Sequence, residues 1–498
     1  MNGTVRELVE RQATLQPDAI FAADGDGQCS ITYAELARAC RQVSALLLSL
    51  GSLPGDTVAL VMPNGLQTLR LLLGAMYGGW CVNPVNLMSQ PDQMRYVLGH
   101  SDCKVVVVSP EWEQPVRAML ADIGREVALL VSEPDDGGLS EEEAQTAPPA
   151  PNALALLMYT SGTTGRPKGV MLTQANLAAN ALAVSAEHGL GPIDRVLAVL
   201  PLYHINAFAV TMLAPLAHGG SLALPPKFSA THFWAQAIDC RCTWLNVVPT
   251  MISYLLEGAV PPREQIARIR FCRSASAPLP PEHLRAFEAR FGIGIIETMG
   301  LTETVAPAFS NPLDAAQRKL GAVGRPSGCE AQVIDANFAP VPDSQTGEIA
   351  IRGPNVMLGY YKNDEATRAT FTPDGWLRSG DLGHRDSDGF FFVTGRIKEL
   401  IIKGGENIAP REIDEALLRH PAVLDAAAVG IPDRHYGQEI MACIVLRPGQ
   451  ALEEAVLRDF CIEQLGRYKT PKVVRFVDEL PRGPSGKVQR LKLLDLPG

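Results

Sequence analysis

Short apolar segments alternate with helical patterns through the middle of this 498-residue chain, and no other feature limits the fold as much. We expect strands at VLAVL, SLAL, TWLNVV, IRFC and IGII, with helices over residues 207–217, 230–239, from 250, and 281–291. Strands joined by helices form right-handed βαβ units, whose parallel sheets are covered on both faces. The sequence therefore predicts an α/β fold with parallel-rich sheets.

The N-terminal part follows the same scheme. Thr32 followed by Glu35 is a capping box, and it predicts a helix that Gly51 closes. Residues 133–152 are acidic and rich in proline and glycine, so we expect an exposed connector there. The other expected elements are strands over 57–62 and 104–109 and a helix over 66–77.

Length and charge exclude several classes of protein. A chain of 498 residues is too long for one ordinary core, so we expect two or more domains. The 44 Lys and Arg residues against 54 Asp and Glu give a net charge of −10, which argues against a protein that coats nucleic acid. The most apolar stretch, residues 207–226, is interrupted by Pro215, His218 and two glycines, so we expect no membrane span.

The ten cysteines indicate a reducing compartment. They are scattered, and the closest pair, Cys240 and Cys242, has no second pair at metal-site spacing. We therefore expect reduced, mostly buried thiols in a cytoplasmic protein rather than a zinc site. The N-terminus shows no basic-then-apolar signal pattern.

A change in charge near residue 396 suggests two domains, 1–395 and 396–498. The C-terminal part holds 16 Lys and Arg against 15 Asp and Glu, a net charge of +1, so the larger part carries −11. Residues 467–492 alone carry +6. This pattern favours a small lid that presents cations to an anionic ligand, although an ordinary solvated face would have the same composition.

The strongest local motif is YTSGTTGRPKG, residues 159–169, which follows an apolar segment. Its glycines allow backbone N–H groups to approach phosphate oxygens, its hydroxyls donate hydrogen bonds, and Lys168 adds positive charge. A Walker A loop needs Gly-Lys followed by Ser or Thr, so this is a different phosphate loop; a purely structural turn is the alternative. The predicted phosphate-binding residues are Thr160, Ser161, Gly162, Thr163, Thr164, Gly165 and Lys168.

The segment LLMYTSGTTGRPKG resembles the signature of the adenylate-forming superfamily, which includes acyl-CoA synthetases, adenylation domains of peptide synthetases, and luciferases. Five further blocks occur in the family's order and extend the resemblance from Thr160 to Lys487. It implies a large N-terminal domain, which binds ATP and the acid, and a small mobile C-terminal domain. The hinge between them would lie near Lys398.

The resemblance implies an ATP site with Mg²⁺. SASAPLP would line the adenine and ETMGLTE would contact it and the phosphates, with Thr302 at the α-phosphate and Glu303 on Mg²⁺. The family usually has Tyr where this chain has Met299, and a thioether can also pack on a purine. The adenine-side residues are Ser276, Ala277, Pro278, Glu297, Thr298, Met299 and Gly300.

The later blocks would complete both half-reactions. By resemblance, Asp381 binds the ribose hydroxyls and Arg396 the ribose and phosphate. Lys403, Gly404 and Gly405 would line the pantetheine tunnel for CoA. Lys487 matches the catalytic lysine that bridges the acid's carboxylate and the α-phosphate, where negative charge grows in the transition state.

The acid pocket is read from PLYHINAF, whose His204 would lie near the acid's carboxylate, and from residues 246–252, 274–278 and 298–300. These segments are largely apolar, which favours an aliphatic or aryl monocarboxylate and a place in fatty acid metabolism. However, RSASAP looks most like the oxalate and small-acid ligases, and Arg273 either pairs a second carboxylate or lies on the surface at the end of a strand. The expected pocket residues are Tyr203, His204, Phe208, Val248, Ser274 and Gly300.

These features predict an ATP-dependent acid–CoA ligase that converts an acid to an acyl-adenylate and pyrophosphate, and then to acyl-CoA and AMP. The catalytic residues would be Lys487, Thr302, Glu303 and His204. The alternatives are a small-dicarboxylate ligase, an enzyme that loads a carrier protein, light-emitting oxygenation, a non-catalytic acyl or nucleotide sensor, and a P-loop kinase. The last would need a Walker A loop and would release ADP.

Overall fold

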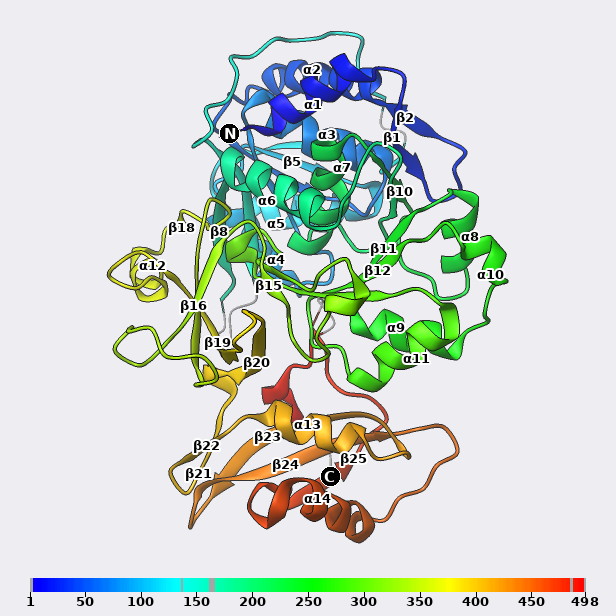
Figure 1. The fold of residues 1–498 in the computed structure, drawn as a ribbon. Helices are drawn as coiled ribbons and strands as arrows, with labels where there is room; N and C mark the ends of the chain where they lie inside the picture. Colours follow the sequence, from blue (N-terminus) through cyan, green and yellow to red (C-terminus); the bar gives the residue numbers. More distant parts are fainter. Residues whose placement is uncertain (1–2, 136–137, 161–165, 484–486, 497–498) are drawn as a thin grey trace.

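The computed structural model describes residues 3–135, 138–160, 166–483 and 487–496. A large lobe contains three sheets and most of the helices, and a smaller C-terminal lobe lies below it (Figure 1). None of the described helices combines the length and the apolarity that crossing a membrane requires. The structure is α/β, as the alternation of apolar and helical segments predicts.

A nine-stranded sheet carries the predicted βαβ segments, in the order β15-β14-β13-β12-β11-β9-β10-β1-β2. Its central strands are parallel, whereas β2, β14 and β15 pair antiparallel at the two edges. The bounds are β1 Ile20–Asp24, β2 Ser30–Thr32, β9 Arg195–Leu197, β10 Ser221–Leu224, β11 Trp244–Val247, β12 Phe271–Ser274, β13 Ile295–Met299, β14 Phe309–Ser310 and β15 Arg325–Pro326.

A seven-stranded sheet, in the order β18-β8-β7-β4-β3-β5-β6, carries the phosphate loop. Strands β7, β4, β3, β5 and β6 are parallel, and β8 and β18 add antiparallel strands on one side. The bounds are β3 Thr57–Val61, β4 Cys81–Pro84, β5 Val105–Val108, β6 Ala128–Val131, β7 Leu154–Thr160, β8 Lys168–Thr173 and β18 Gly359–Tyr360.

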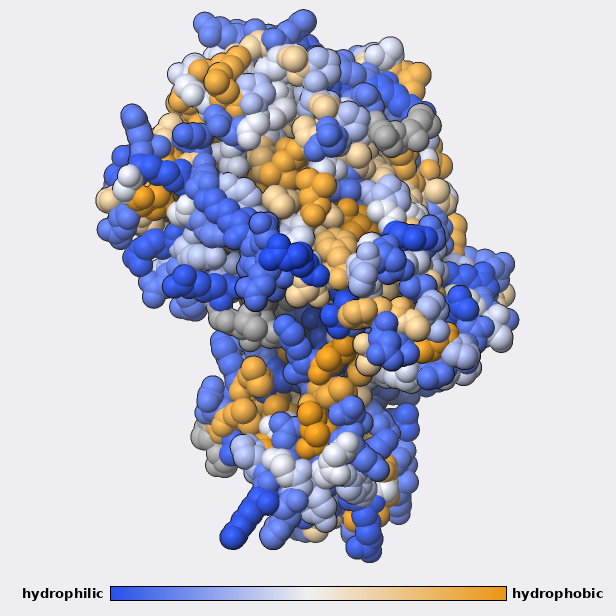
Figure 2. Space-filling view, turned by 90° about the vertical axis from the view of Figure 1, so that its left-hand side faces the viewer, coloured by the Kyte–Doolittle hydropathy of each residue, from blue (hydrophilic) through white to orange (hydrophobic). Residues whose placement is uncertain are grey.

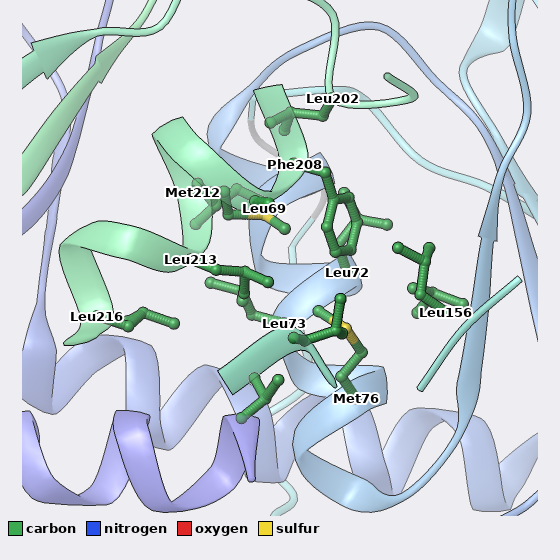
Figure 3. Packing of buried hydrophobic residues seen from close by; sticks show 14 of the residues in the cluster. Leu69, Leu72, Leu73, Met76, Leu156, Leu202, Phe208, Met212, Leu213 and Leu216 are labelled. Atoms are coloured by element: carbon green, nitrogen blue, oxygen red, sulfur yellow. The ribbon is translucent and has the colours of Figure 1, made fainter. Parts of the chain in front are cut away.

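Helices join these strands, and their apolar faces form the largest core. Figure 3 shows Phe208, Met212 and Leu213 facing Leu72 and Leu73 of α3. The bounds in the large lobe are α1 Val5–Leu15, α2 Tyr33–Ser49, α3 Leu66–Gly78, α4 Pro91–His100, η1 Pro110–Trp112, α5 Glu113–Ala121, α6 Gln174–Glu187, the π-helix η2 Asn206–Leu213, α7 Ala214–His218, α8 Phe233–Asp239, α9 Pro249–Glu257, α10 Arg263–Ile266, α11 Pro281–Phe291, η3 Thr302–Thr304, η4 Ala315–Gln317 and α12 Asp364–Thr370.

Several predicted elements occur where the sequence placed them. The capping box of Thr32 and Glu35 starts α2, and α11 has the predicted bounds. The helix predicted over 207–217 is divided into η2 and α7. The strand predicted at IRFC, residues 269–272, begins two residues later, at Phe271. Within the connector 133–152, the described residues form neither helix nor strand.

A four-stranded antiparallel sheet, in the order β16-β17-β19-β20, was not predicted. Its strands are joined by turns and by the short α12, so the strand–helix alternation that identified the other sheets is missing here. Apolar residues of its inner face, including Ile349 and Phe391, pack against Phe309 of the nine-stranded sheet. The bounds are β16 Glu330–Ile334, β17 Gly347–Arg352, β19 Leu377–Arg385 and β20 Phe391–Arg396.

The C-terminal lobe has its own sheet and its own apolar cores. The sheet is antiparallel except for β25, which pairs parallel with β24. The segment η5 Ile397–Glu399 leads into it from β20. The bounds are β21 Ile401–Lys403, β22 Glu406–Ile408, α13 Pro410–Leu418, β23 Val423–Asp433, β24 Gly437–Leu446, α14 Glu454–Lys469, β25 Val473–Phe476 and η6 Arg490–Asp495.

Candidate active site

The two ends of the phosphate loop are held by strand pairing. Thr160 ends β7 and Lys168 begins β8, and the two residues are paired across the antiparallel ladder. The Lys168 ammonium lies 4.7 Å from the centroid of the Tyr360 ring, which is a cation–π contact. The predicted phosphate-binding residues Ser161, Gly162, Thr163, Thr164 and Gly165 lie outside the described residues.

Tyr360 also contacts the carboxylate expected to hold Mg²⁺. Its hydroxyl donates to Oε1 of Glu303 at 2.8 Å, and Glu303 lies beside Thr302 in η3. Within the described residues, this is the only hydrogen bond of the Glu303 carboxylate. One oxygen is therefore fixed by a neutral donor, and the negative charge remains available to a hard cation. Sequence reasoning missed Tyr360, although it lies in the segment GYYKN after a conspicuous RGPN turn.

Asp381 and Arg396 form an ion pair at the lower edge of the antiparallel sheet. They face each other in register on β19 and β20, with Asp381 Oδ1 2.8 Å from Arg396 Nε. Burial raises the pKa of Asp381, while Arg396 and Lys487 act to lower it. Oδ2 of Asp381 is buried and has no hydrogen-bond partner among the described residues. A buried unpartnered carboxylate oxygen fits a ligand that donates hydroxyl hydrogens.

Lys487 reaches this ion pair from the C-terminal lobe. Surrounding protein lowers its pKa and Arg396 lowers it further, whereas Asp381 and Glu303 raise it. Gly483 N–H donates to the Lys487 carbonyl at 2.8 Å, which closes the turn that ends at the lysine. The structure therefore brings four predicted residues, Lys487, Asp381, Arg396 and Glu303, to one cleft between the lobes.

The cleft is a narrow waist on the molecular surface. Figure 2 shows hydrophilic surface at the waist, bordered by a strip of hydrophobic surface that continues into the smaller lobe. The ion pair and Lys487 supply charge to an otherwise partly apolar channel. This combination suits a nucleotide whose phosphates and base need different surroundings.

The predicted adenine segments surround the ends of β12 and β13. Ser276 has φ +75°, a strained conformation for a residue with a side chain, and it is followed by Ala277 and by the exposed Pro278. Met299 packs beside the apolar cluster of the antiparallel sheet. A Cβ on Gly300 would lie 2.6 Å from Cα of Ala306, so packing against the next turn is what requires this glycine.

Glu297 lies beneath the same segment and faces the C-terminal lobe. Burial raises its pKa to about 7. Arg411 of α13 and the backbone N–H groups of Leu279 and Gly321 act in the opposite direction, and Glu415 of α13 adds to the rise. Glu297 is therefore a half-ionised acid at the boundary between the lobes near neutral pH.

The region expected to receive the acid contains a buried cation. Arg273 on β12 is 0% exposed, which excludes the surface alternative for this residue. Its Nη1 donates to Oδ1 of Asn206 and to Oδ1 of Asn246, both at 2.9 Å, whereas Nε and Nη2 have no partner in the part of the chain that the structure describes. Burial lowers its pKa to about 9. Asn206 begins η2, two residues after His204, and its Nδ2 lies 3.5 Å from Oγ of Ser276.

Other predicted pocket residues have different surroundings. His204 and Tyr203 are half-buried, with ring centroids 4.8 Å apart. Ser274 is buried and its hydroxyl is unpartnered, and Thr298 donates to the Ser274 carbonyl at 3.4 Å. Val248 is 8% exposed and belongs to the main core. Phe208 is fully buried against α3 and β7 (Figure 3), so we assign it to the core rather than to a pocket wall.

Lys403 does not present a free ammonium for CoA. It is 6% exposed, lies 2.5 Å from Oε1 of Glu439, and donates to the Tyr468 carbonyl at 2.8 Å. These contacts hold Lys403 within its own lobe, and its predicted contact with CoA stays a prediction. Gly404 and Gly405 have φ of +57° and +89°, which explains both glycines by backbone geometry alone.

Two family models match the chain. An AMP-binding enzyme model matches residues 9–361, and an AMP-binding enzyme C-terminal domain model matches residues 412–487. A sulfoacetate–CoA ligase of Cupriavidus necator is 56% identical over 498 residues, which cover 99% of this chain and 97% of the relative. An oxalate–CoA ligase of Arabidopsis thaliana is 36% identical over 98% of this chain and 97% of its own length.

A solved structure has the same fold over nearly the full length. The crystal structure of ATP-bound MatB from Rhodopseudomonas palustris superimposes with a TM-score of 0.92 at 33% identity. The match covers 98% of each chain, so it includes both lobes and the cleft between them.

Proposed function

The chain belongs to the AMP-binding enzyme family and is an ATP-dependent acid–CoA ligase that forms AMP, and from this premise we propose how its residues divide the two half-reactions and which acid it activates. The observation that carries the proposal is the cleft in which Lys487 of the C-terminal lobe meets Asp381 and Glu303 of the large lobe, with Arg396 at the boundary between the lobes.

In the first half-reaction, a carboxylate oxygen of the acid attacks the α-phosphorus of ATP. The new C–O–P linkage is a mixed anhydride, and pyrophosphate leaves with the electrons of the broken P–O bond. Lys487 bridges the carboxylate and the α-phosphate and stabilises the charge that accumulates between them. Thr302 donates to the same phosphate, and the loop from Thr160 to Lys168 holds the leaving phosphates.

ATP is positioned by the remaining residues of the cleft. The unpartnered Oδ2 of Asp381 accepts a ribose hydroxyl, and Arg396 holds Asp381 in place while facing the nucleotide. Met299 and the segment from Ser276 to Pro278 contact the adenine. Glu303 would hold Mg²⁺, which neutralises phosphate charge when it is bound.

In the second half-reaction, the CoA sulfur attacks the acyl carbon of the adenylate, and AMP leaves with the bonding electrons. The C-terminal lobe, residues 396–498, turns about Lys398 between the two steps. Gly404 and Gly405 then border the path of the pantetheine arm. Because Lys487 moves away with this lobe, it acts in adenylation and not in thioester formation.

The acid is a short carboxylic acid that carries a second anionic group, and sulfoacetate is the first to test. The names of two relatives, a sulfoacetate ligase and an oxalate ligase, support this class over the aliphatic or aryl monocarboxylate favoured by the apolar segments. The assignment of Phe208 to the core also removes one of the apolar walls on which that expectation depended. The ten unpaired cysteines support a cytoplasmic location.

The test is pyrophosphate release with ATP and Mg²⁺, with and without CoA. The acids are sulfoacetate, oxalate, malonate, acetate, propionate, hexanoate and benzoate. We expect AMP, pyrophosphate and a CoA thioester with one or more of the dianionic acids. Thioester formation only on a carrier protein would instead support the carrier-loading alternative. ATP binding without turnover of any acid would contradict the proposed function.

A further inference from the structure

A buried guanidinium without a counter-ion lies in the large lobe. Within the described residues, no carboxylate forms an ion pair or a hydrogen bond with Arg273, although its side chain has no solvent exposure. A buried cation that lacks an anion is costly, and proteins usually pair it or neutralise it. An anionic group beside Arg273 would therefore stabilise the buried guanidinium.

The unpartnered atoms define what kind of anion fits. Nη1 is already bound to two asparagine oxygens, so the guanidinium cannot rotate freely. The other edge, formed by Nε and Nη2, has two N–H groups that point in parallel and have no acceptor. Two parallel donors match two oxygens of one carboxylate, sulfonate or phosphate.

The neighbours of the guanidinium relate it to the segment expected to receive the acid rather than to ATP. Asn206, one of the two asparagines, follows His204 by two residues and contacts Ser276 at 3.5 Å. Asn246, the other, is in register with Arg273 on the neighbouring strand β11. The guanidinium is thus one amide group away from Ser276, which follows β12.

We propose that Arg273 is a specificity-determining residue whose Nε–Nη2 edge binds the second anionic group of the acid, a sulfonate or carboxylate, while the first carboxylate is adenylated. This inference rests on the proposed function. A sulfonate keeps its charge throughout the physiological pH range, so it remains a counter-ion for Arg273 at every pH at which the enzyme works. A monocarboxylate of equal size leaves the guanidinium unpaired and is rejected for that reason.

A neighbouring histidine does not supply the missing charge. His188 is buried near Arg273, and its Nε2 is also unpartnered. Burial lowers the pKa of His188 to about 3, and Arg273 lowers it further, so the imidazole is neutral at neutral pH. A neutral ring can accept one hydrogen bond, but it cannot balance a buried positive charge.

The first test compares two acids in Arg273→Met, which keeps an unbranched side chain and removes the guanidinium. We expect kcat/KM for sulfoacetate to fall roughly 100-fold, while kcat/KM for propionate stays the same or rises. The matched control is Arg270→Met, because Arg270 precedes the same strand and is already paired with Asp194. The control should leave the ratio of the two substrates unchanged.

The second test does not depend on the folding of a cavity-forming variant. Asn246→Asp places a carboxylate at the atom that now lies 2.9 Å from Nη1, so the chain itself supplies the counter-ion. We expect KM for sulfoacetate to rise about tenfold or more, with KM for ATP unchanged. Direct binding of sulfoacetate in the presence of AMP, measured by calorimetry, should weaken by the same factor.

The outcomes distinguish a failure of the inference about Arg273 from a failure of the proposed ligase function. If neither variant changes the ratio of sulfoacetate to propionate, or if the wild-type enzyme prefers propionate, Arg273 does not select the acid, yet the ligase function stands. If the wild-type enzyme forms no thioester with any acid, the proposed function itself fails. Rescue of Arg273→Met on sulfoacetate by millimolar guanidinium ion would further support the inference.

Discussion

Two arginines, the buried Arg273 in the large lobe and the half-buried Arg490 in the C-terminal lobe, are held in opposite ways. In the C-terminal lobe, Arg490 donates to Glu399 at 3.1 Å and to the Ala428 carbonyl at 2.8 Å, and it forms an ion pair with Asp414. Burial lowers the pKa of Arg490, but these carboxylates outweigh burial and raise it. In the large lobe, Arg273 has two neutral amides and no carboxylate, and burial lowers its pKa to about 9.

This difference indicates that Arg490 stabilises the fold, whereas Arg273 is available to bind an anionic ligand. Arg490 joins η6 to α13, β23 and η5, so it fixes the loop that carries Lys487 to the rest of its lobe. Among the described residues, Arg273 forms no ion pair with another helix or strand. A chain that had needed Arg273 only for stability would have gained more from an acidic neighbour or from an apolar side chain.

Lys487 is a third cation, which is exposed in this structure, and removing it should have the largest effect. It faces carboxylates of the other lobe, so it resembles Arg490 in charge balance and Arg273 in facing a ligand. Lys487→Met should lower the rate of adenylation about 1,000-fold, because the charge that it stabilises grows in the transition state. Pyrophosphate release measures this step.

The same variant should form the thioester from supplied acyl-adenylate and CoA at nearly the wild-type rate. The control is Lys492→Met, an exposed lysine of η6 five residues further along the chain, which should leave both half-reactions unchanged. Equal losses in both half-reactions would show that Lys487 does not move away between them.

Stability measurements test the comparison of the two arginines directly. Arg490→Met leaves Asp414 and Glu399 without their cation and should lower the free energy of unfolding of the C-terminal lobe by about 3 kcal/mol. Arg273→Met removes an unpaired buried charge and should leave the stability equal or higher. Hydrogen exchange in α13 and in β12 reports each lobe separately.

A second change at the Arg490 site provides the control. Adding Asp414→Leu to Arg490→Met removes the stranded carboxylate as well and should recover part of the lost stability. If Arg273→Met destabilises its lobe as much as Arg490→Met destabilises the other, then both arginines are structural and the comparison is wrong.

The sequence predicted the parts of this picture that have a local signal. The βαβ segments have one, as α11 shows, and so do the motif residues Asp381 and Lys487. The antiparallel sheet was missed because its strands are joined by turns rather than by helices.

The state of Arg273 could not be decided from the chain. An arginine at the end of a predicted strand is equally compatible with surface and interior, and only the packing of η2 against β11 and β12 buries it. The asparagine in TWLNVV was the one available signal, since a polar residue within a buried strand needs a partner.

Glu297 is the anionic counterpart of Arg273, a half-buried carboxyl whose raised pKa Arg411 offsets only in part. Because its pKa is raised from 4.5 to about 7, the folded protein binds more protons than the unfolded chain between these values. Stability should therefore fall as pH rises through this window, on the order of 2 kcal/mol between about pH 5 and pH 8. Urea midpoints across the window measure it.

Glu297→Gln should flatten this dependence and be more stable than the wild type at the alkaline end. The control is Glu282→Gln on the exposed face of α11, which should leave the pH profile unchanged. An unchanged slope in Glu297→Gln would mean that its carboxyl is solvated in the folded state.

The smallest expected effect is that of changing Tyr360, which hydrogen-bonds the Glu303 carboxylate without neutralising its charge. Its hydroxyl holds one oxygen of Glu303, and its ring lies against Lys168, so it links the carboxylate proposed to hold Mg²⁺ to the end of the predicted phosphate loop. Tyr360→Phe keeps the ring and removes the hydrogen bond, which should lower kcat/KM for MgATP about tenfold. The concentration of Mg²⁺ needed for half-maximal activity should rise, whereas KM for the acid should not change.

Tyr361→Phe is the matched control, because the neighbouring hydroxyl donates to Asp102 instead. If the two variants behave alike, the loss comes from the segment that contains both tyrosines and not from Glu303, and Tyr360 is not a positioning residue.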